Sequence, residues 1–128
     1  MPTLATLPAA SAVSFFREKS LTNAAVVADA NSGSIRMIDC DNTANTATTF
    51  FKIYNLAAAS VVFHASTAGS STNPYIQIAV PSSKRVVVTV DSTDATLGTA
   101  ISCAALTTGG TLGTTAPTAA VGIRMLLS

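Results

Sequence analysis

Few side chains in this sequence have the chemistry of a catalytic or metal-binding site. The acids are Glu18, Asp29, Asp39, Asp41, Asp91 and Asp94, and the single histidine is His64. A histidine acting as a general base needs an acid or a nucleophile arranged around it. No sequence signature of such a partner accompanies His64, so we interpret it as a surface residue or a hydrogen-bonded structural residue. We therefore expect no enzymatic activity.

Asp39 and Asp41 are the one pair of acids whose spacing could place them together. If the strand predicted before residue 41 continued, the two carboxylates would share a face. A glycosidase needs two carboxyl groups facing one sugar bond, but a pair at this spacing more often frames a turn or a weak cation site. A calcium site needs six or more oxygen ligands. We expect neither a cofactor nor a metal.

Cys40 and Cys103 each lie in, or at the end of, a predicted strand. A bridge between two sheets and a pair of free thiols are both compatible with that placement. A structural zinc site is poorly supported, because two cysteines and one histidine do not complete a four-ligand shell. The glycine-rich run at residues 109–113 lacks the following Lys-[Ser/Thr] of a phosphate loop, so we interpret it as a flexible surface loop.

The element around which the chain is organised is residues 41–55, a polar turn-rich run that leads directly into alternating side chains. In an extended strand, Phe51 and Ile53 face one side, while Phe50, Lys52 and Tyr54 face the other. The first face is wholly apolar and the second is amphipathic. This pattern predicts a central strand with one face on a core and the other toward solvent or a neighbour.

Turn signals divide the rest of the chain into further short strands. We predict strands at residues 24–28, 34–40, 60–64, 75–80, 84–90, 99–106 and 121–127. In residues 34–40, the alternation would put Ile35, Met37 and Asp39 on one face. Residues 75–90 have the pattern of a β-hairpin around Pro81. About eight short strands without a convincing long helix predict an all-β fold, an antiparallel β-sandwich of jelly-roll type.

The first 20 residues differ from the rest of the chain. Pro2 and Pro8 disfavour a regular element there, and Phe15 and Phe16 precede the charged residues 17–19. We expect an extended N-terminal arm over residues 1–20, followed by a β-sandwich domain over residues 21–128. The arm could dock its aromatic rings on a neighbour, or it could fold back on its own domain.

Composition narrows the classes of partner. The chain has 128 residues, a net charge of +1 and only 10% charged residues, against roughly 25% in an average soluble domain. Without a dense basic cluster, we expect no nucleic-acid partner. The sequence has no apolar run of transmembrane length and no basic leader before an apolar segment, so we expect neither a membrane partner nor a secretory signal.

Taken together, these short strands, the sparse charge and the loops rich in Thr, Ala and Ser, such as residues 41–49 and 107–118, resemble small virion proteins of tailed bacteriophages. The resemblance covers residues 24–127. It implies a structural β-sandwich, either a capsid decoration or cement protein on the outer surface of the shell, or a tail or fibre component. It also implies assembly in the bacterial cytoplasm, where Cys40 and Cys103 would stay as free buried thiols.

Two functions therefore follow as expectations. In the first, the protein binds the major capsid protein as a homotrimer, a state implied by the resemblance, and stabilises the shell by burying interfaces. The contact residues expected for this role are Phe15, Phe16 and Arg17 of the arm, and Phe50, Lys52 and Tyr54 of the central strand. In the alternative, the protein is a receptor- or glycan-binding module of a tail or fibre, although two tyrosines and no tryptophan offer few platforms for sugar stacking.

Overall fold

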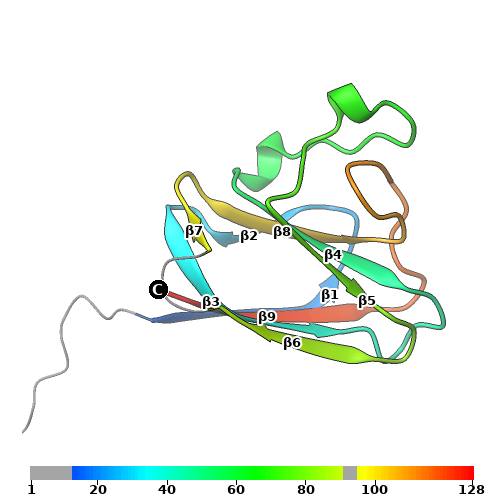
Figure 1. Cartoon of the computed structure of the whole chain (residues 1–128), viewed down its shortest axis with the longest axis horizontal. Coiled ribbons are helices and arrows are strands. Elements are labelled where there is room, and N and C mark those ends of the chain that lie inside the picture. Colours follow the sequence, from blue (N-terminus) through cyan, green and yellow to red (C-terminus); the bar gives the residue numbers. More distant parts are fainter. Residues whose placement is uncertain (1–12, 91–94) are drawn as a thin grey trace, which may run out of the picture.

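A computed structural model describes residues 13–90 and 95–128, and in this part of the chain nine strands form two antiparallel sheets (Figure 1). The strands are β1 (Ser14–Leu21), β2 (Val26–Asp29), β3 (Gly33–Asp41), β4 (Thr49–Tyr54), β5 (Ile76–Val80), β6 (Arg85–Thr89), β7 (Thr96–Leu97), β8 (Ile101–Leu106) and β9 (Val121–Leu127). The predicted all-β sandwich is confirmed.

The strand order is that of a jelly roll. One sheet, called sheet A below, has the order β1-β9-β3-β6, with the short β7 also pairing with β3; the other, sheet B, has the order β2-β8-β4-β5. The main pairs are therefore nested along the chain, with β1 on β9, β2 on β8, β3 on β6 and β4 on β5. This is a long antiparallel ribbon folded over on itself, the arrangement that defines a jelly roll.

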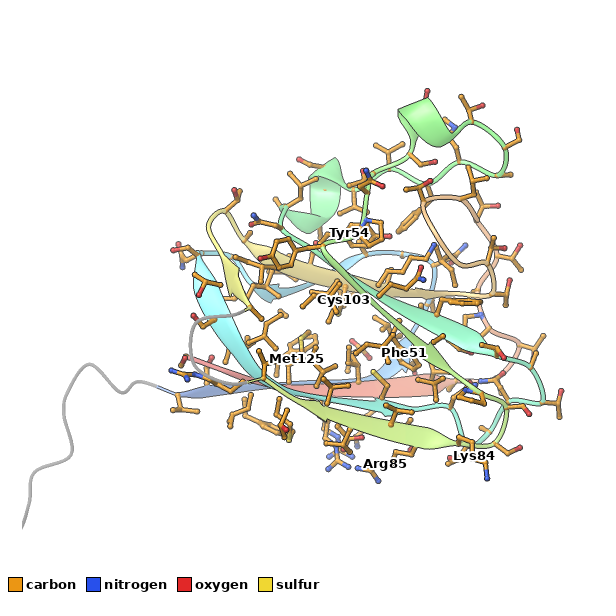
Figure 2. All side chains as sticks on the ribbon, viewed as in Figure 1. Phe51, Tyr54, Lys84, Arg85, Cys103 and Met125 are labelled. Carbon is orange, nitrogen blue, oxygen red and sulfur yellow. The ribbon has the colours of Figure 1, made fainter. Side chains whose placement is uncertain are left out.

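The core lies between the two sheets and is built by the alternation expected from the sequence. Phe51 and Ile53 point into it from β4, and neither has any exposed surface. Figure 2 shows Phe51 and Cys103 of sheet B facing Met125 of sheet A. The other members from β9 are Val121, Ile123 and Leu127, as the pattern of residues 121–127 predicted.

Strand β3 departs from simple alternation because it contains a bulge. Its pairing with β9 shifts register between Ile35 and Met37, so Ile35, Ile38 and Cys40 all reach the core. The expectation that Ile35, Met37 and Asp39 share one face is therefore wrong. A bulge inserts one residue and reverses the side on which the following side chains lie. As a result, Met37 and Asp39 lie on the outer side of sheet A.

The hairpin predicted over residues 75–90 is also wrong, because its two strands lie in different sheets. β5 pairs with β4, whereas β6 pairs with β3. The turn between them is held by the loop that follows β3: Ser83, with a positive φ of 59°, donates its N–H to the Asn45 carbonyl at 2.9 Å. The Asn42 amide donates to the carbonyls of Val80 at 3.0 Å and Pro81 at 3.1 Å. These bonds direct the chain across to the other sheet.

The strand predicted at residues 60–64 does not form. A short 3₁₀ helix, η1 (Ala58–Ser60), precedes an extended segment, and a second, η2 (Ala68–Ser70), follows it. The Thr72 N–H donates a hydrogen bond to the Val62 carbonyl, and the Val62 N–H donates one to the Thr72 hydroxyl oxygen, each at 2.9 Å. This segment therefore lies over the sandwich without joining a sheet ladder.

Of the two alternatives for the N-terminal segment, its described part folds back on its own domain. Residues 1–12 lie outside the described part of the chain, but residues 14–20, which we assigned to the arm, belong to β1. This strand pairs with β9 in a register that places Phe16 opposite Met125, and Phe16 packs against the core. Of the two aromatic residues that suggested a docking segment, Phe16 thus belongs to the domain's own sheet and core. The strand β7 was missed, because it lies between the strands predicted at residues 84–90 and 99–106.

Candidate functional site

The two sheets differ in what covers their outer sides. Residues 55–75 and 107–118 lie over sheet B, as Figure 1 shows above β8, β4 and β5. Lys52 is fully buried beneath them and donates its ammonium to the Leu112 carbonyl at 2.9 Å. Burial lowers the pKa of Lys52. The Tyr54 ring meets Phe63 edge-on with centroids 6.0 Å apart, and burial raises the pKa of Tyr54 to about 12.

This cover corrects the expected contact row on β4. Lys52 and Tyr54 have essentially no exposed surface, so neither can reach a partner while residues 55–75 and 107–118 stay in place. Phe50 is half-buried beneath the glycine-rich loop, where a Cβ added to Gly109 would lie 2.8 Å from Phe50 Cε1. Phe50, Lys52 and Tyr54 were predicted to face outward, but the molecule's own loops use that face.

The glycine-rich loop is packed on the sheet, not free at the surface as we expected. Gly110 donates its N–H to the Gln77 side chain at 2.8 Å, and Gly113 donates to the His64 carbonyl at 2.9 Å. Gly113 also has a φ of 112°, a conformation that favours glycine. The role of His64 shown by this contact is structural, through its backbone carbonyl.

On sheet A, by contrast, no segment of the described residues covers the outer side, which we call the open face. Its outward residues are Phe15, Arg17 and Lys19 of β1, Gly122, Arg124 and Leu126 of β9, Met37, Asp39 and Asp41 of β3, and Arg85 and Val87 of β6. Phe15 is 58% exposed and Val87 is 54% exposed. Of the residues predicted to make contacts, Phe15 and Arg17 lie on this face, while Phe16 points to the core.

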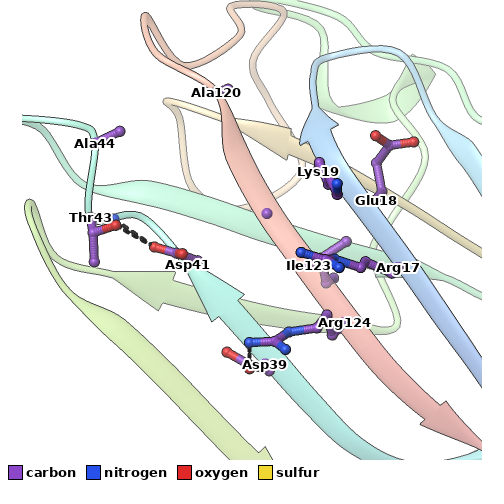
Figure 3. Close-up of a pocket in the computed structure, with 11 residues that line it drawn as sticks. Arg17, Glu18, Lys19, Asp39, Asp41, Thr43, Ala44, Ala120, Ile123 and Arg124 are labelled. Carbon is purple, nitrogen blue, oxygen red and sulfur yellow. Dashed lines mark hydrogen bonds and ion pairs between the residues drawn. The ribbon is translucent and has the colours of Figure 1, made fainter.

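A buried carboxylate organises the centre of the open face. Asp39 is only 6% exposed and binds two arginines. Arg85 Nε lies 2.7 Å from Asp39 Oδ1, and Arg85 Nη2 also binds Oδ2. Arg124 Nη2 lies 3.0 Å from the same Oδ2, as the dashed line in Figure 3 marks. The hydrogen bonds to Asp39 raise the pKa of Arg85, so Arg85 stays charged at any ordinary pH.

The second carboxylate of the pair, Asp41, frames a turn. Its Oδ1 accepts the Thr43 hydroxyl at 2.6 Å and the Thr43 N–H at 3.0 Å. These bonds lower the pKa of Asp41. Asp39 and Asp41 do share a face, but each has its own partners. Within residues 13–90 and 95–128, no three histidine, cysteine or acidic side chains gather as a metal site.

A shallow pocket lies on the open face beside this cluster. It has a volume of about 260 Å³, and Figure 3 shows it above β9, between β1 and β3. Its lining includes Arg17, Lys19, Arg124, Asp39 and Asp41, with Gly122 on the central strand. Arg17 lies directly opposite Arg124 in the β1–β9 ladder. Like charges directly opposite each other in a sheet are destabilising, and of these two arginines only Arg124 is paired with Asp39 within the described residues.

Three of the edge strands, β1, β2 and β5, carry or adjoin features that disfavour pairing with another strand. β1, at one edge of sheet A, contains a register shift between Glu18 and Leu21, and β2, at one edge of sheet B, has one between Val27 and Asp29. Pro81 follows directly after the edge strand β5. Bulges, charged side chains and prolines are the means by which edge strands avoid edge-to-edge association. The open face is therefore the more accessible contact surface.

The expectation of free buried thiols is confirmed, since Cys40 and Cys103 are both buried and unbridged. Burial raises the pKa of both thiols, and that of Cys103 reaches about 12. Low reactivity follows, because the thiolate is the reactive form of cysteine.

Sequence reasoning missed Lys19, Arg85, Gly122 and Arg124 as site residues. The signal for the two on β9 was present, because the apolar alternation of residues 121–127 leaves Gly122 and Arg124 on the outward side. Their meeting with Asp39 could not be predicted without the strand order and the β3 bulge.

Comparison of the chain with protein-family models, with curated proteins and with solved structures gives no match. What is established is therefore the class of fold, an antiparallel β-sandwich with jelly-roll strand order, and the open face it presents. Among the residues that the structure describes, no helix has the length and apolar character needed to span a membrane.

Proposed function

We propose that this protein is a non-enzymatic virion structural protein of a tailed bacteriophage, a capsid decoration or cement protein that binds the outer surface of the major capsid shell. The observation that carries the proposal is the contrast between the two outer sides of the sandwich. Loops of the same chain cover Lys52 and Tyr54 on the central strand β4 of sheet B, although Val27 of its edge strand β2 stays 47% exposed, whereas sheet A exposes Phe15 and Val87 beside a charged cluster. Exposed apolar side chains on one face favour a protein contact.

The mechanism proposed is burial of the open face against shell subunits. Phe15 and Val87 supply apolar area near opposite edges of sheet A, and the Asp39 cluster between them supplies fixed charges that set orientation. Each contact is modest by itself. The symmetry of the shell repeats the contact, and an oligomer links several copies, so the stabilisation from the individual contacts adds up.

The fold supports this proposal only by analogy. Jelly rolls occur in viral capsid proteins and in lectins, and a fold alone does not determine function. The sparse charge, at 10% of residues, fits a surface that is covered by other protein in an assembly. The proposed location is the capsid surface of the virion, after assembly in the host bacterial cytoplasm. The proposed partners include neither nucleic acid nor membrane.

A homotrimer remains part of the proposal, and the charges indicate which surface would not form it. Two copies related by a two-fold axis through the open face would bring Arg17 and Arg124 of one copy toward the same residues of the other. That contact is electrostatically unfavourable. The subunits of the oligomer should therefore meet through other surfaces, which leaves the open face for the shell.

The alternative, a glycan-binding module of a tail or fibre, ranks second. Tyr75 is 50% exposed and Phe15 is 58% exposed, but they lie on different sheets. Tyr75 directly precedes β5 of sheet B, and Phe15 belongs to β1 of sheet A. No single site among the described residues therefore offers two exposed rings for sugar stacking.

Cosedimentation with phage particles tests the proposal. Shells prepared without this protein should bind the full chain, and Val87→Asp on the open face should abolish binding. Val62→Asp is the matched control, because Val62 is 45% exposed in the segment that covers sheet B, and it should bind as the parent does. Imaging of intact particles should place hundreds of copies on the shell. A location confined to the tail, or absence from particles, would overturn the proposal.

A further inference from the structure

The pocket above β9 exists because one outward position has no side chain. Gly122 lies between Glu18 of β1 and Asp41 of β3, where a Cβ would be 3.7 Å from the Glu18 carbonyl oxygen and 3.8 Å from Asp41 Cβ. Both are ordinary van der Waals distances, and the backbone there has no positive φ. The backbone therefore does not require glycine, and the consequence of glycine here is empty space on a charged surface.

The carboxylates around this space already have partners. Asp39 binds Arg85 and Arg124, and Asp41 accepts two bonds from Thr43. Glu18, which also lines the pocket, accepts the Ser20 N–H at 2.9 Å. Asp39 is neutralised by its two arginines, whereas Asp41 and Glu18 accept hydrogen bonds from neutral groups and keep their charges.

The cations do not all have partners. Within the described residues, no carboxylate forms an ion pair with Arg17 or Lys19. Arg17 also faces Arg124 across the β1–β9 ladder. With Arg85 included, four cations (Arg17, Lys19, Arg85 and Arg124) lie with three carboxylates (Glu18, Asp39 and Asp41), an excess of one positive charge. An anion placed over Gly122 would lie near Arg17 and Lys19, the two cations that have no ion pair within the described residues.

We propose that the Gly122 pocket binds the side-chain carboxylate of an aspartate or glutamate on an acidic loop of a partner protein. The volume of about 260 Å³ suits one acidic side chain, and the Arg17 guanidinium can bind a carboxylate through two parallel hydrogen bonds. Phe15, two residues before Arg17 on the same side of β1, is 58% exposed, which favours a protein ligand over a free ion. This inference rests on the proposed function in one respect, namely that the partner is the shell protein.

A second copy of the chain is a poorer occupant. Contact between two open faces would oppose arginines to arginines, and the carboxylates of this face are already bonded. An acidic loop of a different protein has the complementary charge, which is what specifies partner choice across an interface.

The binding test uses the full ¹⁵N-labelled chain at low salt with a defined probe, N-acetyl-glutamate N-methylamide. Its carboxylate should shift the amide resonances of Gly122 and its neighbours, with saturation in the millimolar range. The uncharged glutamine analogue should shift none of them. Arg17→Gln should weaken binding by about tenfold, as loss of a charge-assisted bond does, and Gly122→Val should abolish it by filling the pocket. Lys84→Gln, outside the pocket, is the matched control and should bind as the parent does.

Two results would overturn the inference. One is binding of inorganic phosphate or sulfate as tight as that of the glutamate probe, which would mean a general anion site. The other is unchanged probe binding in Gly122→Val that is shown to be folded by circular dichroism. Failure of the proposed function is distinguishable: there the probe would still bind at Gly122, but the parent chain would not cosediment with shells. Conversely, normal cosedimentation of the Gly122→Val and Arg17→Gln variants would remove the inference and leave the proposed function standing.

Discussion

The buried thiol of Cys103 should make the protein lose stability in alkali by a predictable amount. Cys103 is fully buried between the sheets, and its pKa is raised from 9.0 to about 12. The folded state therefore keeps its proton at a pH where the unfolded chain releases it. The stabilisation from the neutral thiol is complete below pH 9.0 and is lost as the pH rises toward the folded pKa.

The magnitude follows from proton linkage. From pH 9.0 to about pH 10.5, the free energy of unfolding falls by about 2 kcal/mol through this one thiol, at about 1.4 kcal/mol per pH unit. Cys103→Ala removes the titrating group and leaves a small cavity, which costs about 1–2 kcal/mol at neutral pH. The variant should therefore be less stable than the parent near neutral pH, and equally or more stable at about pH 10.5.

Urea unfolding at both pH values measures this change in the order of stability. Unfolding is followed by far-ultraviolet circular dichroism, because the chain has no tryptophan, and a reductant is present throughout. The difference between parent and variant cancels the titration of every other group to first approximation. Ile53→Val is the matched control, since Ile53 pairs with Cys103 across β4 and β8 but does not titrate. Its cost of about 1 kcal/mol should be independent of pH. A cost of Cys103→Ala that is the same at both pH values would refute the reasoning.

Three further predictions concern the packing of the loops. Burial lowers the pKa of Lys52 from 10.5, so the folded state releases this proton at a lower pH than the unfolded chain does. The parent should therefore gain stability relative to Lys52→Met as the pH rises toward 10.5, the reverse of the thiol effect. The same urea titration measures this gain, and a stability difference that does not change with pH would contradict the burial of the charge. Asn42→Ala should destabilise by about 3 kcal/mol, because it removes donors to buried carbonyls and the acceptor of the Thr49 hydroxyl. In a double-mutant cycle with Thr49→Val, the coupling energy should be about 1 kcal/mol, and strict additivity would show that the two side chains do not interact. Gly109→Val should lower the thermal midpoint by several degrees, because its Cβ would meet the Phe50 ring at 2.8 Å, and an unchanged midpoint would mean that the loop does not pack on Phe50.

The sequence predicted the parts of the fold that depend on alternation. Strand β9 shows why: Val121, Ile123, Met125 and Leu127 recur with period two, and all four are buried. Successive side chains of a strand point to opposite faces, so a period of two places all four on the same face. The class of fold followed from the number of such segments and the turn signals between them.

The prediction failed where one extra residue in a strand, or a contact between distant segments, determines the path of the chain. Nothing in residues 34–40 signals the bulge that turns Met37 outward, because a bulge depends on the pairing with β9. The turn after Val80 has the composition of a hairpin turn, but the Asn42 amide bonds to the carbonyls of Val80 and Pro81 send β6 to the other sheet. Both errors come from interactions between segments far apart in the chain.

Only part of the candidate site was predicted: Phe15 and Arg17 lie on the open face, whereas the three residues expected from β4 do not. The amphipathic side of β4 and the outward side of β1 have similar patterns, and either could have faced a partner. Alternation separates the core side of a strand from its outer side, but it cannot show whether loops of the same chain cover the outer side. Lys52 is covered because the Leu112 carbonyl approaches it, whereas nothing in the described chain lies over Arg17. The contact surface therefore shifts from β4 to β1 and β9, where Gly122 leaves room among the arginines.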